Sequence, residues 1–256
     1  MSEFWIRVIV AIFGIIILSA VLYIGGIIIN IAVFFLILIG LFELRKAFLK
    51  LDIKLKSEYL FLISIFNFLE VYFFNSIIFT VYFIMVLSLF DLLFLRNNIM
   101  NVSILTFSLF YVILGFSSIA LIQNSAFIGL IFIIAFSTDS FAYLVGISLG
   151  KHKLIPDVSP KKSIEGAIGG IVATVIITTL YLSYFGIGIL PIDLILGFTG
   201  SIIAQCGDLV ASRIKRDTGI KDFGHLIPGH GGIIDRFDSV ILVAPVVLNL
   251  YFYFYF

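Results

Sequence analysis

The chain has 256 residues, of which 62% are hydrophobic and only 12% charged, and its mean hydropathy is +1.24. Soluble domains carry about 25% charged residues, so a soluble fold could not bury this much apolar surface. The formal net charge of +1 gives no support to nucleic-acid binding, and the single cysteine, Cys206, excludes an internal disulfide.

Apolar runs long enough to cross a bilayer recur along the whole chain. A transmembrane helix needs about 17 to 25 mostly apolar residues, and the runs Ile6–Ile24 and Ile27–Phe42 are of this kind. The first run lacks a small-x-small cleavage site, so we expect it to be retained rather than removed as a signal peptide. The sequence predicts an all-α, polytopic transmembrane helical protein with about nine spans, at residues 5–24, 27–42, 59–74, 77–95, 99–115, 126–149, 166–186, 191–211 and 233–254.

The basic residues indicate how these spans are oriented. Cytoplasmic loops of membrane proteins carry an excess of Lys and Arg. With the N-terminus in the cytoplasm, all 16 basic residues fall on the cytoplasmic side, at Arg7, in 43–58, at Arg96, in 150–165 and in 212–236. An odd number of spans then places the aromatic C-terminus outside.

Polar residues divide the chain into two regions. We expect residues 1–125 to be a membrane scaffold, since their isolated acids Glu70 and Asp91 read as interfacial carboxylates that reach water. We expect residues 126–256 to form the catalytic membrane region, with its active site at the cytoplasmic face.

Four aspartates lie near the predicted cytoplasmic ends of spans in the second region. A charged residue inside a bilayer costs about 2.5 to 3.5 kcal/mol, so these acids need compensation. Ion pairs with Arg213 and Arg236 would supply it, but an oxygen-rich Mg²⁺ site would do so too. We expect metal ligation by Asp208, Asp235 and Asp238, the last two sharing a helix face. For Asp139, a hydrogen bond within the helix packing stays equally open.

Two basic segments lie on the same predicted side and suit phosphate binding. In the segment 150–165, Ser163 is expected to cap a helix whose N-terminus attracts anions, beside Lys161 and Lys162. The segment 212–238 adds Lys215, Arg216 and Lys221 as candidates for phosphate binding, and the glycine turn Pro228–Gly232, through which the backbone can approach a ligand closely. Together with the aspartates, these residues suit a metal-dependent reaction on a polyphosphate.

The second basic segment resembles the signature of the phosphatidate cytidylyltransferases, also called CDP-diacylglycerol synthases. Similar stretches occur at 139–143, 159–166 and 207–209, while residues 1–125 share only the hydropathy of that family. Small departures at Ser140, Ile164 and Ala211 affect no candidate ligand. The matching positions read Ser212-x2-Lys215-Arg216-x4-Lys221-Asp222-x-Gly224-x3-Pro228-x-His230-Gly231-Gly232-x2-Asp235-Arg236-x-Asp238.

The resemblance implies a homodimeric enzyme of the bacterial cytoplasmic membrane that converts CTP and phosphatidic acid into CDP-diacylglycerol and pyrophosphate. It implies Mg²⁺ as cofactor, held by Asp208, Asp235 and Asp238, and leaves open a second cation such as K⁺. It also implies catalytic roles for Lys215, Arg216, Lys221, Asp222, His230 and Arg236, and nucleotide binding by Ser159, Lys161, Lys162, Ser212, Gly229, Gly231 and Gly232.

Two other functions remain open from the sequence. A CTP-dependent enzyme acting on another membrane lipid would share the phosphate chemistry and differ in the groove for the lipid chains. An ion-coupled transporter would also place carboxylates within the membrane. A basic glycine turn at one face favours phosphate chemistry over transport, and paired broken helices are not discernible.

The charge pattern yields a prediction of topology. Because the Lys and Arg residues segregate to one side of the nine-span arrangement, a reporter fused after Phe256 should read as external. A reporter inserted in the segment 150–165 should read as cytoplasmic. If both report the same side, the number of spans is wrong.

Overall fold

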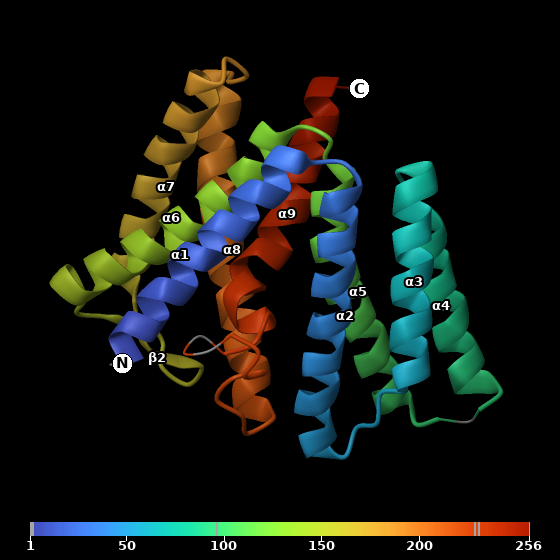
Figure 1. The fold of residues 1–256 in the computed structure, drawn as a ribbon. Coiled ribbons are helices and arrows are strands. Elements are labelled where there is room, and N and C mark those ends of the chain that lie inside the picture. Colours follow the sequence, from blue (N-terminus) through green and yellow to red (C-terminus); the bar gives the residue numbers. More distant parts are fainter. Residues whose placement is uncertain (1–2, 96, 228, 230, 256) are drawn as a thin grey trace. The chain divides into compact units, whose positions relative to one another are not determined.

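The computed structural model describes residues 3–95, 97–227, 229 and 231–255. Within these ranges the chain forms nine α-helices, one at each predicted span (Figure 1). The helices are α1 (Glu3–Ile24), α2 (Ile27–Phe48), α3 (Ser57–Phe74), α4 (Ile78–Leu93), α5 (Ile99–Leu121), α6 (Ser125–Leu149), α7 (Ile164–Tyr184), α8 (Leu190–Asp217) and α9 (Ile234–Tyr255).

Seven of the described helices are long and apolar enough to cross a membrane. The other two, α4 with 16 residues and the apolar stretch Val8–Ile24 of α1, are shorter. A short 3-10 helix, Leu49–Leu51, extends α2, and a two-stranded hairpin precedes α7. These observations confirm the predicted fold class, a polytopic helical membrane protein.

Several helices continue beyond the ends predicted from hydropathy. Helix α2 runs to Phe48 rather than 42, α5 to Leu121 rather than 115, and α8 to Asp217 rather than 211. Hydropathy marks only the part of a helix that suits the hydrocarbon of a bilayer. Leu, Glu, Arg and Lys also form helices well outside that part, so a helix can continue beyond it. The extension of α2 places Glu43 within a helix.

The chain separates into two compact units. The first unit comprises Met1–Gln123 and Asp217–Phe237, and the second comprises Asn124–Arg216 and Asp238–Phe256. The first boundary between the units lies after Gln123. The segment 217–237, which carries much of the basic motif, groups with the first unit.

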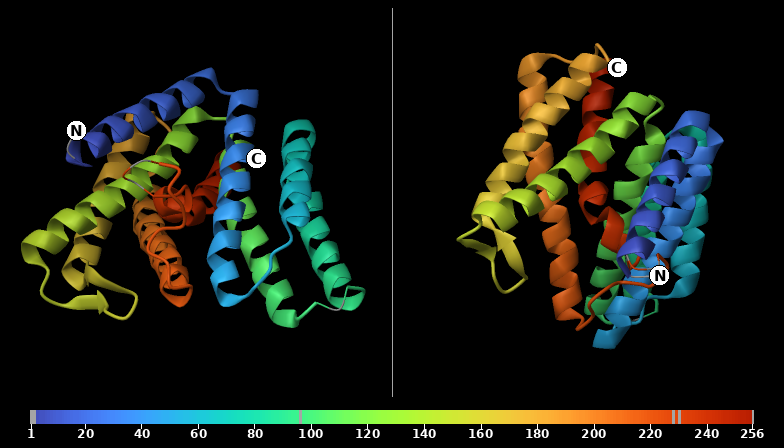
Figure 2. Two further views of the ribbon diagram at one scale, coloured as in Figure 1. Left: turned by 60° about the horizontal axis from the view of Figure 1, so that its bottom comes forward. Right: turned by 60° about the vertical axis from the view of Figure 1, so that its left-hand side comes forward.

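In the first unit, α2 packs against α3 and α5, and α4 packs against α3 and α5. These four helices lie side by side in both figures (Figures 1 and 2). Their shared core includes Leu41, Leu60, Ile63 and Leu109, each fully buried. This core forms because each helix presents a row of apolar residues to its neighbours.

Glu70 is buried rather than interfacial, with 4% of its surface exposed, which corrects the expectation from the sequence. Its Oε1 accepts a hydrogen bond from the N–H of Phe79 at 2.9 Å. Its Oε2 accepts from the N–H and the hydroxyl of Thr80, each at 2.6 Å. The N-cap residue of α4, Ile77, makes no side-chain capping bond, so Glu70 of the preceding helix satisfies the second and third N–H groups of α4.

Asp91 is likewise buried, with 3% exposed, and does not reach water as expected. Its carboxylate accepts hydrogen bonds from Lys56 Nζ at 2.6 Å and from Asn97 Nδ2 at 2.7 Å. Burial disfavours the charge of Lys56, but the hydrogen bond to Asp91 and the negative charge raise the pKa of Lys56 overall. The ammonium group therefore keeps its proton at neutral pH.

In the second unit, α6 and α7 pack closely along their length. A Cβ on Gly166 would lie 2.6 Å from the carbonyl oxygen of Ala142, so this approach requires a glycine. Deeper in the unit, the buried hydroxyl of Thr138 lies 2.9 Å from that of Thr174 and 3.0 Å from that of Ser201. These bonds link α6, α7 and α8 where water cannot serve as a partner.

The capping role of Glu70 predicts a loss of stability on its removal. Glu70→Ala leaves two backbone N–H groups of α4 and the Thr80 hydroxyl without their acceptor, which should destabilise the protein by about 1 to 3 kcal/mol. Glu58→Ala, an exposed position on the same helix, should change stability by less than about 0.5 kcal/mol. Thermal unfolding in detergent measures both, and equal melting temperatures would contradict the capping role.

Candidate active site

The basic segment 150–165 forms a hairpin that was not predicted from the sequence. Strand β1 (Lys153–Ile155) pairs antiparallel with β2 (Ser159–Ser163), with Lys153 opposite Ser163. The pairing gives the polar backbone of this segment hydrogen-bond partners of its own. It places Lys161 and Lys162 on β2, directly before the first turn of α7.

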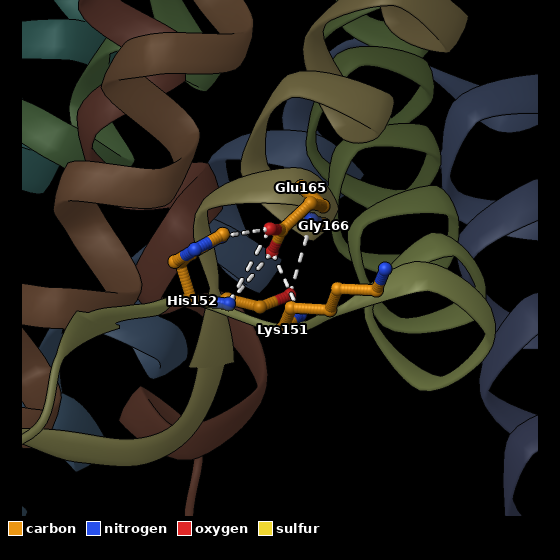
Figure 3. A network of polar contacts seen from close by, with 5 residues as sticks. Lys151, His152, Glu165 and Gly166 are labelled. Carbon is orange, nitrogen blue, oxygen red and sulfur yellow. Dashed lines mark hydrogen bonds and ion pairs between the residues drawn. The ribbon is translucent and has the colours of Figure 1, made fainter.

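The hairpin is fastened to α7 by a set of polar contacts (Figure 3). Ser163 is the N-cap of α7, as predicted, and its hydroxyl accepts a hydrogen bond from the N–H of Gly166 at 3.1 Å. Glu165 accepts from the N–H groups of Lys151 at 3.0 Å and His152 at 3.2 Å, and its Oε1 lies 2.6 Å from His152 Nδ1. His152 therefore has a structural partner.

A cavity of about 590 Å³ lies in the second unit, beside this hairpin. Its lining includes the carboxylates of Asp139 and Asp208 and basic residues of the hairpin. Apolar and small side chains complete the wall. The lining residues are Asp139, Ala142, Tyr143, Gly146, Ile147, Lys153, Leu154, Lys161, Lys162, Ser163, Ala167, Gln205 and Asp208.

Asp208 of α8 pairs with a lysine of the hairpin. Its Oδ2 forms an ion pair with Lys162, and its Oδ1 accepts a hydrogen bond from the Ser212 hydroxyl at 3.2 Å. Both side chains of the ion pair are about a quarter exposed, at 25% for Lys162 and 28% for Asp208. The pair is therefore reachable by a solute in the cavity.

Asp139 and Asp238 lie near Asp208 and add negative charge to this region. The Ser239 hydroxyl donates a hydrogen bond to Asp139 at 3.1 Å, and the Ser239 N–H donates one to Asp238 at 2.8 Å. Both carboxylates are therefore bonded to the same residue of α9. Asp139 and Asp208 both repel the charge of Asp238, and Lys215 attracts it. Asp139 therefore lies beside Asp208 and Asp238 in the second unit.

Gly207 lets α8 and α9 approach each other at this point. A Cβ on Gly207 would collide with the carbonyl oxygen of Asp238 and lie 3.1 Å from the Cα of Ser239. Close packing of the two backbones places Asp208, the next residue, beside Asp238. Later on α8, Arg216 Nε donates to the carbonyl of Val158 at 3.3 Å, which connects this helix to the hairpin.

The other predicted site residues lie in the first unit, in and after the loop of residues 218–233, called here the glycine loop. Asp235 Oδ2 accepts from the N–H groups of Phe223 at 2.8 Å and Gly232 at 2.9 Å. The Gly231 N–H donates to the Ile227 carbonyl at 3.1 Å. In this conformation the amides of Gly231 and Gly232 are thus engaged inside the loop, and Lys221 is exposed.

Each unit holds part of the predicted site. The second unit contains Ser159, Lys161, Lys162, Asp208, Ser212, Lys215, Arg216 and Asp238, and the first contains Lys221, Asp222, Gly229, Gly231, Gly232, Asp235 and Arg236. His230 lies outside the described residues.

Glu43 is a residue of this region that the sequence did not single out. It is buried in α2, with 5% exposed, and its carboxylate accepts hydrogen bonds at the start of α9. The available signal was a carboxylate at the end of an apolar run. Because Arg45 and Lys46 follow it closely, the sequence places that carboxylate in a predicted cytoplasmic loop.

The acidic residues have the donor chemistry that Mg²⁺ requires. Mg²⁺ prefers carboxylate oxygens and usually keeps several waters. Asp208 and Asp238 offer such oxygens in the second unit, with Asp139 beside them. In the described part of the chain, no three acidic, histidine or cysteine side chains are already arranged as a metal-binding group. Metal ligation by Asp208, Asp235 and Asp238 stays a prediction.

Comparison with known proteins places these residues in context. The sequence profile of the cytidylyltransferase family matches residues 5–254. A Bacillus subtilis protein named phosphatidate cytidylyltransferase is 40% identical over 159 residues, which cover 59% of this chain and 58% of that protein. Proteins of the same name from Staphylococcus aureus (strain COL) and Staphylococcus saprophyticus are 41% and 37% identical, each over 59% of this chain and 60% of its relative. The matched region therefore spans about three fifths of the length of these relatives.

The close contact at Gly207 predicts that even one methyl group there is harmful. Gly207→Ala must separate α8 from α9, and such overpacking costs about 1 to 3 kcal/mol. Gly14→Ala is the matched control, since Gly14 lies in α1 with no atom within 4 Å of its added Cβ and alanine favours helix. Melting temperatures in detergent compare the two, and an unchanged value for Gly207→Ala would show that the helices can separate without loss.

Proposed function

Since the chain belongs to the cytidylyltransferase family, we propose that it transfers CMP from CTP to phosphatidic acid, yielding CDP-diacylglycerol and pyrophosphate. The names of the relatives from Bacillus and Staphylococcus support this acceptor. The observation that carries the proposal is the cavity of the second unit, which is lined by carboxylates, lysines and apolar side chains. Such a cavity suits a substrate with a phosphate head and lipid chains.

The proposed reaction needs charge neutralisation more than it needs a base. A phosphate oxygen of phosphatidic acid forms a bond to the α-phosphorus of CTP, and the bond from that phosphorus to the β-phosphate bridging oxygen breaks. Pyrophosphate leaves with the electron pair. The nucleophile is already an anion, so the main obstacle is the repulsion between two phosphorylated substrates.

The basic residues are placed to reduce that repulsion. Lys161 and Lys162 line the cavity, and the N-terminus of α7 follows them with the positive end of its helix dipole. Lys162 can exchange its bond to Asp208 for a substrate phosphate, because both partners are partly exposed. Lys215, Arg216 and Lys221 would hold further phosphate oxygens, with Arg236, Asp222 and His230 in supporting contacts.

Mg²⁺, held by Asp208, Asp235 and Asp238, would supply additional positive charge to the triphosphate and the departing pyrophosphate. The carboxylates of this chain supply the hard oxygen ligands. The Ser212 hydroxyl, through its bond to Asp208, keeps one of these carboxylates oriented. A second cation such as K⁺ would join the same acidic region.

The membrane location agrees with the two substrates. We place the site at the cytoplasmic face of a bacterial membrane, because the basic segments that contain it should remain on that side. CTP would then arrive from water while the acyl chains of phosphatidic acid remain in the bilayer. A homodimer, as the resemblance implies, is part of the proposal.

A direct assay tests the activity. The full chain, purified in detergent, is incubated with CTP labelled in the cytidine, phosphatidic acid and Mg²⁺, and label is followed into the lipid phase. Incorporation that depends on phosphatidic acid supports the proposal. Label that enters only when a polyprenyl phosphate replaces phosphatidic acid would assign another lipid acceptor, and no incorporation with either lipid would overturn it.

Neutral replacements of the aspartates test the metal assignment. Asp238→Asn keeps the side-chain size but removes an anionic oxygen, so it should lower turnover at least about a hundredfold and raise the Mg²⁺ concentration needed. Asp235→Asn should act in the same direction. Asp52→Asn, in an exposed left-handed turn that asparagine also adopts, should retain activity. If the purified, folded Asp235→Asn and Asp238→Asn proteins show unchanged turnover and Mg²⁺ requirement, the metal assignment is wrong.

A further inference from the structure

The Glu43 carboxylate accepts two hydrogen bonds at the start of α9, inside the first unit. Its Oε1 accepts a hydrogen bond from the N–H of Ile233, and its Oε2 accepts from the N–H of Ile234, each at 2.9 Å. These N–H groups lie at the positive end of the helix dipole, where a carboxylate is stabilising. One buried side chain of α2 thereby fixes the point at which the glycine loop becomes a helix.

The same carboxylate explains two glycines of the loop. A Cβ on Gly224 would lie 2.6 Å from Glu43 Oε1, and a Cβ on Gly232 would lie 2.6 Å from Glu43 Cδ. Neither glycine has the positive φ that would require glycine on conformational grounds. Both are therefore glycine because the loop folds tightly around the Glu43 side chain.

Asp235 holds the loop from within, and Gly232 lies in contact with both acids. While its Cα faces Glu43, its N–H donates to Asp235 Oδ2, which also accepts from the N–H of Phe223. Ile227 and Gly231 exchange both backbone hydrogen bonds across the turn. The loop that carries Lys221 thus has its shape fixed at both ends, and one fixed point is a residue from far earlier in the chain.

We infer that Glu43 is a positioning residue for the CTP phosphates, acting through the glycine loop and touching no substrate itself. The inference rests on the proposed function, in which Lys221 contacts those phosphates. A loop ordered before binding loses less conformational entropy when CTP binds, so losing the Glu43 contacts weakens CTP use in particular. The effect falls on the KM for CTP more than on overall stability.

Glu70 provides a matched control within the same unit. It too is a buried glutamate whose two oxygens accept backbone N–H groups at the start of a helix, but that helix is α4. Loss of the Glu70 carboxylate removes the same kind of interaction without affecting the glycine loop. A difference between Glu43 and Glu70 variants therefore reports on position in the structure rather than on loss of a capping carboxylate.

The first experiment compares Glu43→Gln with Glu70→Gln in the cytidylyl transfer assay. Glutamine keeps one acceptor oxygen and places an amide N–H₂ against the second backbone N–H. Glu43→Gln should raise the KM for CTP about tenfold, while the KM for phosphatidic acid stays within about twofold. Glu70→Gln should lower the melting temperature and leave the KM for CTP unchanged. Equal effects of the two variants on the KM for CTP would overturn the inference.

A second experiment covers the case in which Glu43→Gln does not fold. Gly224→Ala places a methyl group against the Glu43 carboxylate, so it should raise the KM for CTP in the same direction. In a Glu43→Ala background the methyl group has space, so the two changes together should be less harmful than the sum of their separate effects. An unchanged KM for CTP in Gly224→Ala would contradict the inference.

Limited proteolysis separates this inference from the proposed function, because it needs no substrate. Lys221 is exposed, and trypsin cleaves after it only when the loop opens. Glu43→Gln should speed cleavage after Lys221 several-fold relative to the unchanged chain, whereas Glu70→Gln should not. If the unchanged chain fails to use CTP but this difference appears, the function is wrong and the positioning of the loop stands. If cleavage is the same in both variants, Glu43 does not hold the loop.

Discussion

The need to satisfy charge inside an apolar protein shapes most of what is distinctive in this structure. A carboxylate away from water is costly unless donors or cations surround it. Glu70 accepts hydrogen bonds from the first turn of α4, and Glu43 accepts them from the start of α9. Asp91 accepts hydrogen bonds from Lys56 and Asn97. In each case the acid joins segments that are separate in the sequence, so burial and connection go together.

The acids of the second unit differ from these three because they repel one another. Asp139 and Asp208 both repel the charge of Asp238, while Lys215 attracts it and Lys162 pairs with Asp208. A group of like charges lowers the stability of a fold, since apolar side chains filling the same volume would be more stable. Under the proposed function, a polyphosphate and its counter-ion would bind beside this group and balance its charge.

Glycines enable this arrangement in two ways. Gly166 and Gly207 allow helices to approach until backbone meets backbone, and the approach at Gly207 brings Asp208 and Asp238 together. Gly224 and Gly232 allow a loop to close around a buried carboxylate. The glycine turn of the sequence was interpreted as a place where backbone meets a ligand. In the structure, part of that close approach is to the chain's own Glu43.

The sequence by itself determined the number and placement of the helices and the residues of the basic motif. Those features follow from hydropathy over one helix length and from local spacing, which are properties of neighbouring residues. It also identified Ser163 as a helix cap, because a capping hydrogen bond reaches only three residues along the chain.

Only the tertiary structure decided which acids have partners and which segments belong together. Glu70 and Asp91 read as exposed, and Glu43 as part of a loop, because their partners or their helical setting depend on residues beyond the local pattern. The segment 217–237 groups with the first unit for the same reason, since its anchor on α2 is about 190 residues away in sequence. Hydropathy reports how well each residue suits the bilayer. Which carboxylate meets which N–H group depends on how helices pack, and that is a property of the folded chain.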